Sequence, residues 1–486
     1  MSAALLAACS RPPAPPPPAP RTVEIVVPAE ADAAPRATCT MKRAPAPIVA
    51  LSPDGSLLAT GAATAASASD EDEDPSHRAI DLWDLRTGTL RATLDAGSPF
   101  LSTLEFSPDG RFLVSVLNHH TGDGEVRLWD AQTGTLVAKQ GTACFEQLVW
   151  SPDSRWVATS GCEMALGVIH VDGRTWRREY VVKDGDGAAS QDTPIAATPD
   201  GKQLLYWVQD GRFEAYDVTG AAPKRVRAAT TTRWAALAVD VEADRVALVG
   251  TTFGDKTVNT VELLTARTGA RTKLVHPKEA LGYEPEWIVL TPPGDVLIGQ
   301  NGGGVLLVAR DGGTRRLRET PSVAGVAPPR IAPDRRALVV AEDEHTCALW
   351  ELAPLRRARV LPFASCSVAW LPDSRRALAA ASDDAVDVVD LRTDARGMRL
   401  ALSLDAPFTW RRDGEVIAVA GDPVRLLRTS TGDAVHLWTL VSGAHRTGVI
   451  TTATGAWAGD PAAIACAPGA DPAQRKPSLA SDVLGL

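Results

Sequence analysis

The chain has 486 residues, of which 45% are hydrophobic and 22% charged, and its formal net charge is −9 at pH 7. These values are typical of a soluble globular protein. No apolar run reaches the roughly 18 residues that a membrane-spanning helix needs, which excludes a helical membrane protein. Mild acidity and the lack of aromatic residues interleaved with a basic stripe argue against binding to nucleic acid.

Residues 1–45 are predicted to form an anchor and tether. The first ten residues are too short and too uncharged for a secretory signal, but segment 6–9, Leu-Ala-Ala-Cys, resembles a bacterial lipobox and predicts lipidation at Cys9. Residues 11–20 are mostly proline, as expected for an extended tether. This interpretation places the true start codon upstream of Met1. The alternative is a disordered Ala/Pro tail on a cytosolic protein.

A hairpin phrase then recurs along the chain. Ser-Pro-Asp-Gly occurs at residues 52–55 and 107–110, and each copy is followed by Leu-Trp-Asp and then Thr-Gly. The hairpins begin near Ser52, Ser107, Ser151, Thr198, Asp240, Thr291, Ala332, Leu371 and Arg411, with a first gap of 55 residues and then gaps of 44, 47, 42, 51, 41, 39 and 40. Such a period, with apolar runs on both sides of each turn, predicts a β-propeller.

Each unit is predicted to contain four strands. An apolar strand leads through a Pro-Asp turn to a second strand, the third strand carries the Leu-Trp-Asp phrase, and a Thr-Gly turn leads to the fourth. Four antiparallel strands make one blade. We therefore expect an all-β chain with a single propeller of seven to nine blades over residues 46–466, followed by a disordered tail over 467–486.

The phrases resemble those of the WD-repeat family, in its bacterial Ser-Pro-Asp-Gly style, over roughly 400 residues. Trp83, Trp129, Trp350 and Trp438 all fall where the third strand should end. The Gly-His dipeptide of that family is absent, so the blades are expected to be held by apolar packing and strand ladders alone. The resemblance also implies that a strand from one terminus completes a blade begun at the other, with segments 47–51 and 448–460 as candidates.

The cysteines predict disulfides. Without Cys9 six remain, an even number that favours an oxidising compartment. Cys144 and Cys162 flank one predicted hairpin symmetrically, Cys347 and Cys366 flank another, and Cys39 and Cys466 lie near the two chain ends, where a bond between them would staple the ring. The alternative is six buried thiols.

Enzymatic signatures are scarce, and no catalytic residue or cofactor is predicted. There is no Gly-x-Ser-x-Gly elbow of a hydrolase. The phrase at residues 129–134 partly resembles the repeat of quinone-dependent dehydrogenases, but the later tryptophan and the adjacent cysteine pair of that family are missing. A glycosidase would need two converging carboxylates, which repeat-turn aspartates do not suggest.

Two loops suggest a weak metal hypothesis. The run Asp70, Glu71, Asp72, Glu73 and Asp74 with His77 lies in one loop, and His119, His120 and Asp123 lie in the same loop of the next unit. The spacings match no metal motif, so solvated loops are the preferred interpretation and no metal is predicted.

Charges separate between the two faces of the predicted disc. Loops joining strands two and three total about −13, whereas turns joining strands three and four total about +16. The acidic face is expected to include Asp70, Glu71, Asp72, Glu73, Asp74, Glu342, Asp343 and Glu344, and the basic face Arg315, Arg316, Arg356 and Arg357.

The sequence therefore predicts a monomeric, non-enzymatic scaffold that binds another protein or an anionic surface of the cell envelope. It would be an outer-membrane or periplasmic lipoprotein that touches the membrane only through its anchor. The alternatives are a periplasmic propeller enzyme similar to quinone-dependent dehydrogenases, and a cytosolic signalling scaffold.

Overall fold

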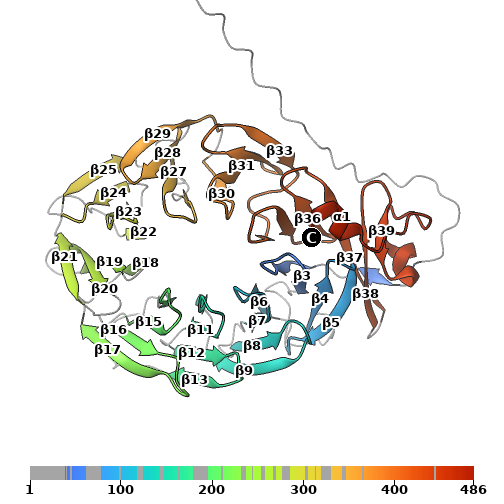
Figure 1. Ribbon diagram of the computed structural model, residues 1–486, viewed down its shortest axis with the longest axis horizontal. Coiled ribbons are helices and arrows are strands. Elements are labelled where there is room, and N and C mark those ends of the chain that lie inside the picture. Colours follow the sequence, from blue (N-terminus) through green and yellow to red (C-terminus); the bar gives the residue numbers. More distant parts are fainter. Residues whose placement is uncertain are drawn as a thin grey trace, which may run out of the picture.

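Over the residues that it describes, the computed structural model is a ring of nine antiparallel β-sheets, in which eight sheets have four strands and one has seven (Figure 1). The all-β propeller is confirmed, and nine blades fall at the upper end of the expected range. The structure describes residue 39 and residues 41–43, 46–61, 78–97, 100–117, 124–142, 147–161, 165–178, 195–208, 212–230, 237–242, 245–252, 258–265, 270–275, 285–300, 305–311, 313–318, 330–341, 346–363, 366–442 and 445–486.

Blades are numbered along the chain, and in each blade the strands run from the inside of the ring to the outside. Blades 1 to 3 contain β2 (Ile48–Leu51), β3 (Leu57–Gly61), β4 (Ala79–Asp84) and β5 (Thr89–Asp95); β6 (Leu101–Phe106), β7 (Phe112–Leu117), β8 (Gly124–Asp130) and β9 (Leu136–Thr142); β10 (Gln147–Trp150), β11 (Trp156–Gly161), β12 (Ala165–His170) and β13 (Thr175–Arg178). Blades 4 to 6 contain β14 (Ile195–Ala197), β15 (Gln203–Val208), β16 (Arg212–Asp217) and β17 (Lys224–Thr230); β18 (Leu237–Glu242), β19 (Arg245–Thr252), β20 (Val258–Thr265) and β21 (Arg271–Val275); β22 (Pro285–Leu290), β23 (Val296–Gln300), β24 (Val305–Val308) and β25 (Thr314–Arg318). Blades 7 to 9 contain β26 (Arg330–Ile331), β27 (Ala337–Ala341), β28 (Cys347–Leu352) and β29 (Leu355–Leu361); β30 (Val368–Trp370), β31 (Arg376–Ser382), β32 (Ala385–Asp390) and β33 (Arg396–Leu400); β34 (Phe408–Trp410), β35 (Val416–Val419), β36 (Val424–Arg428) and β37 (Ala434–Ser442).

The hydrophobic core lies between neighbouring blades. All residues of β3 and β7 are buried, whereas β5 alternates between exposed positions and positions that, apart from the buried Leu94, are only half-buried. The second strand of each blade is covered by a neighbouring blade on each side, and its sequence is therefore mostly apolar, while the fourth strand borders solvent. One core cluster, for example, joins Ile80 and Leu82 of blade 1 to Leu113 of blade 2.

The first and the last described strands meet in blade 9. Strand β37 pairs on one side with β38 (His445–Thr451), which continues to β39 (Trp457–Gly459), and on the other side with the short strand β1 (Lys42–Arg43). The predicted closure is thus wrong in detail, because β2 is the inner strand of blade 1 and the terminal strands extend blade 9 outward. The N-terminal strand that closes the ring by pairing with β37 is instead β1, which lies within residues 1–45, the segment predicted to be a tether.

The C-terminal segment is ordered, which corrects the predicted disordered tail. The 3-10 helix η3 (Pro461–Cys466) and helix α1 (Leu479–Leu484) follow β39. Leu479, Ala480 and Leu484 of α1 are buried in the cluster that joins blades 9 and 1, so apolar burial orders this segment. We call β38, β39, η3 and α1 together the clasp.

A buried ion pair fixes the clasp to blade 1. The Arg446 guanidinium of β38 donates to Asp81 of β4, with Nε 2.8 Å from Oδ1 and Nη2 2.6 Å from Oδ2. The two side chains are 9% and 1% exposed. Nearby, a Cβ atom built on Gly448 would lie 2.3 Å from Cζ3 of Trp83, so the clasp backbone rests directly on the indole.

Within the described residues, no helix is both long enough and apolar enough to cross a membrane.

Candidate functional site

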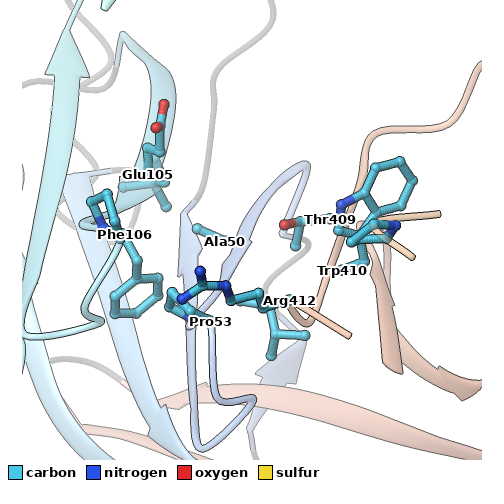
Figure 2. A pocket seen from close by; sticks show the side chains of 11 residues that line it. Ala50, Pro53, Glu105, Phe106, Thr409, Trp410 and Arg412 are labelled. Carbon is cyan, nitrogen blue, oxygen red and sulfur yellow. The ribbon is translucent and has the colours of Figure 1, made fainter. Parts of the chain in front are cut away.

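A pocket of about 440 Å³ lies at the inner end of blades 8, 9, 1 and 2. Its walls come from the inner strands β2, β6 and β34 and from the turns that follow them (Figure 2). Phe106 and Trp410 supply aromatic surface, Pro53 and Pro108 supply turn surface, and Glu105, Thr409 and Arg412 supply polar groups. The arrangement is a mixed apolar and charged recess of the size that ligand and peptide side chains occupy.

The recurring Ser-Pro-Asp-Gly turns position this surface. In blade 1, Ser52 Oγ donates to Asp54 Oδ1 at 2.7 Å and accepts from the Leu57 amide at 2.9 Å. Gly55 follows with a φ of 75°, a left-handed conformation that glycine adopts without strain. The turn is closed by its own side chains, and Pro53 is therefore held facing the pocket.

Neighbouring turns are also bonded to each other. The Arg412 amide donates to the Pro53 carbonyl at 3.1 Å, which links blade 9 to blade 1. The Asp109 amide donates to Ser154 Oγ at 3.0 Å, which links blade 2 to blade 3. These bonds hold turns beside the pocket in fixed relative positions, which lowers the entropic cost of binding.

Electrostatics set Glu105 apart within the pocket. Burial among the surrounding inner strands raises the pKa of its carboxyl group to about 7, although the side chain itself reaches solvent. Arg412 is exposed and lies between Glu105 and Trp410 in the close view (Figure 2). Near neutral pH the pocket therefore contains the cationic Arg412 and the Glu105 carboxyl group, whose protonation can change when a charged group binds beside it.

Two of the three predicted disulfides are present. Cys39 is bonded to Cys466, with Cα atoms 4.9 Å apart, and Cys347 is bonded to Cys366, with Cα atoms 5.4 Å apart. The first bond joins the segment before β1 to the end of η3, so it staples the chain ends as expected.

Several predicted site residues lie outside the described residues. These are Cys9, Cys144, Cys162, the acidic-face residues Asp70, Glu71, Asp72, Glu73, Asp74, Glu342, Asp343 and Glu344, and the loop histidines His77, His119 and His120. The acidic face, the anchor and the third disulfide remain predictions.

The four basic-face arginines are not in turns. Arg315 and Arg316 lie in β25, and Arg356 and Arg357 lie in β29, which are the outer strands of blades 6 and 7. Arg315, Arg356 and Arg357 are exposed, and Arg356 Nη2 is 2.6 Å from Glu351 Oε2 of the neighbouring strand. The exposed side chains of Arg315, Arg356 and Arg357 therefore belong to outer strands of the ring rather than to turns.

Tryptophan hydrogen bonds correct a second expectation. Trp83 Nε1 donates to Thr60 Oγ1 at 3.0 Å, and Trp129 Nε1 donates to Ser115 Oγ at 2.9 Å. Each bond joins the third strand of a blade to its second strand. Packing and strand ladders are thus supplemented by buried side-chain bonds, even without the Gly-His dipeptide.

The sequence interpretation also missed a set of charged residues on the third strands. Asp81, Glu214 and Asp387 occupy the same position in β4, β16 and β32, and all three are buried. Glu214 accepts from Arg225 at 2.9 Å, and Asp387 accepts from Arg399 at 2.7 Å. The signal was present in the sequence. In each of these strands an acidic residue lies three positions before the aspartate that ends the strand, and it interrupts a largely apolar segment.

A comparison with protein families finds one match. The profile of the eukaryotic translation initiation factor eIF2A family matches residues 75–172. These residues include blade 2 and parts of blades 1 and 3, so the match covers about two repeats of the ring.

Individual proteins show the same kind of similarity. A WD repeat-containing protein, SL1-17, of Schistosoma mansoni is 29% identical over 144 residues, which are 28% of this chain and 43% of that protein, so the match spans less than half the length of its relative. A solved structure of a eukaryotic initiation factor is 12% identical, with a TM-score of 0.48, over 78% of this chain and 93% of the other. Sqt1 of Chaetomium thermophilum, solved bound to the N-terminus of ribosomal protein L10, is 17% identical, with a TM-score of 0.46, over 79% and 95% of the two chains. The sequence matches support a resemblance to WD-repeat proteins.

Proposed function

We propose that this protein is a non-enzymatic interaction scaffold that binds a segment of another protein in the inner pocket. The observation that carries the proposal is the composition of the pocket, in which Phe106 and Trp410 stand with Glu105 and Arg412 beside turns fixed by hydrogen bonds. Aromatic and arginine side chains in a pre-arranged recess dominate the binding energy of many protein interfaces. The similarity to a WD repeat-containing protein supports a role in protein interaction.

The proposal extends to the location of the protein. The lipobox-like segment ending at Cys9 and the proline-rich residues after it support a lipid-anchored protein of the cell envelope. The disulfides Cys39–Cys466 and Cys347–Cys366 support an oxidising compartment, since such bonds persist there and are rare in the cytosol.

Location is tested with Cys9→Ser, expressed from an upstream start codon. The parent should partition into membranes and the variant into the soluble fraction, whereas equal partition of both would contradict the anchor. Free thiols at all four bonded positions in protein isolated from its native host would favour the cytosolic scaffold instead.

Binding is tested by cross-linking in intact membranes, with a photoreactive residue at position 409. We expect a discrete cross-linked partner whose yield falls at least about tenfold in Arg412→Glu, because a reversed charge opposes the partner's own pattern. Arg111→Glu is the matched control, since Arg111 is also exposed and lies in the corresponding turn of blade 2. Equal yields from both variants would show that the pocket does not bind the partner. Turnover of a quinone by the purified protein would favour the enzymatic alternative.

A further inference from the structure

The outer strands of blades 1 to 8 carry charges of nearly one sign. Strands β5, β9, β13, β17, β21, β25, β29 and β33 together contain 17 lysine and arginine residues and one acidic residue, Asp95. We call these eight strands the outer belt. The whole chain has a net charge of −9, so the positive charge of the belt is a local feature.

These strands form the outer circumference of the ring (Figure 1). Each is the last strand of its four-stranded sheet, and in the described part of the chain no further strand pairs with it in blades 1 to 8. Lys139, Arg177, Arg315 and Arg356, from four different blades, are exposed. Cationic side chains are therefore presented at intervals around the circumference.

Acidic residues on the third strands neutralise only part of this charge. The third strands of the same blades contain ten acidic and two basic residues, which leaves an excess of eight positive charges over the outer two strands of the eight blades. Glu214 and Asp387 are both buried, and they hold Arg225 and Arg399 from the inside. A ligand that approaches from outside consequently meets arginines first.

The shape of the belt selects among anionic ligands. A flat membrane can touch only a short arc of a convex circumference, whereas a flexible chain can follow it. Arginine guanidinium groups bind carboxylates through paired hydrogen bonds. Single-stranded nucleic acid gains much of its affinity from stacking on aromatic side chains, and Trp176 is the one aromatic residue of the eight belt strands.

We propose that the outer belt binds a linear polysaccharide rich in carboxylates, a polyuronate, which lies along the circumference of the ring. The proposal rests on the proposed location outside the cytoplasm, where such polymers occur, and is separate from the binding of a protein in the inner pocket.

The test uses the full-length protein and polygalacturonate of defined length, with binding measured by isothermal titration at several salt concentrations. The parent should bind with an affinity that falls steeply as salt rises, because each neutralised carboxylate releases counterions. Replacement of Arg315, Arg356 and Arg357 together by serine should lower the affinity at least about tenfold at low salt. The slope of log K against log salt should fall by about two, as expected for three lost contacts to a single-stranded polyanion.

A matched triple variant separates position from net charge. Replacement of Arg111, Lys202 and Arg336 by serine removes the same charge from exposed positions in the turns between first and second strands. This control should keep the affinity within about twofold of the parent. Equal losses in both triples, no binding of the parent, or binding insensitive to salt would each overturn the proposal.

Two further probes identify the class of ligand. Anionic phospholipid vesicles and single-stranded DNA are compared with polygalacturonate at equal charge concentration. Tighter binding of either probe, lost in the Arg315, Arg356 and Arg357 variant, would replace the polysaccharide with that ligand and overturn the proposal. Cross-linking at position 409 in the same variant should be unchanged, so failure of the belt and failure of the inner pocket are distinguishable.

Discussion

The ion pair between Arg446 and Asp81 should decide whether the clasp stays closed. Replacement of Arg446 by methionine removes three donor contacts and leaves the Asp81 carboxylate, which is 1% exposed, without its cation. Breaking a buried pair from one side costs about 3 to 5 kcal/mol, because the remaining charge keeps its desolvation penalty. We expect a loss of stability in this range for Arg446→Met.

The double variant Asp81→Leu, Arg446→Met tests the reasoning behind that value. Both replacements are apolar, so no uncompensated charge remains; methionine is close to arginine in volume and leucine is somewhat larger than aspartate, so stability should return to within about 1 to 2 kcal/mol of the parent. Thr93, whose Oγ1 donates to Asp81 Oδ1 at 3.0 Å, is exposed and can bond to water instead. The two changes are therefore expected to be strongly non-additive.

Equilibrium unfolding in urea is the appropriate measurement, because guanidinium chloride would screen the ion pair. Tryptophan fluorescence follows the transition, since Trp83 lies against the clasp. If the double variant is as unstable as Arg446→Met, the loss comes from packing rather than from a buried charge, and the argument is refuted.

Three other predictions follow from the same structure. Loss of the Cys347–Cys366 disulfide, whose cysteines are 19 residues apart, should lower the free energy of unfolding by about 3 kcal/mol on the chain-entropy estimate, and peptide mapping without reductant should recover the linked pair. Gly448→Val should destabilise by at least about 1 to 3 kcal/mol because its side chain meets the Trp83 ring, whereas Gly220→Ala, whose Cβ would make only an ordinary contact of 3.7 Å with the Ala222 carbonyl oxygen, should be nearly neutral in thermal melting. Because folding raises the pKa of Glu105 to about 7, the folded protein binds more protons than the unfolded chain between about pH 4.5 and 7. The free energy of unfolding should therefore fall as pH rises through this range. Urea unfolding at several pH values should show a weaker pH dependence for Glu105→Gln than for the parent.

Much of the fold could be predicted because it repeats. Each Ser-Pro-Asp-Gly or related turn marks the same place in a blade, so the period also identifies the units near Asp240 and Thr291, which lack the Ser-Pro-Asp-Gly phrase. The disulfide between Cys39 and Cys466 was predictable for a similar reason, since a closed ring brings its two ends together.

The clasp could not be predicted because it occurs once. Segment 467–486 contains several prolines, and its apolar residues show no period, so the burial of Leu479 and Leu484 depends on a surface that only the closed ring provides. The inner pocket was missed for the same physical reason. Glu105 and Arg412 are far apart in sequence, and each belongs to a turn or strand whose individual pattern is ordinary.

The place of the clasp in the chain imposes an order on biosynthesis. Trp83 and Leu58 of blade 1 are synthesised early, yet their covering residues, Ile450 and Ala458, are synthesised only after blades 1 to 8. Blades 1 to 8 can therefore assemble while one end of the arc still presents an uncovered apolar face. Throughout that interval the growing arc needs either a chaperone or rapid completion, and truncation before residue 445 would make this exposed state permanent.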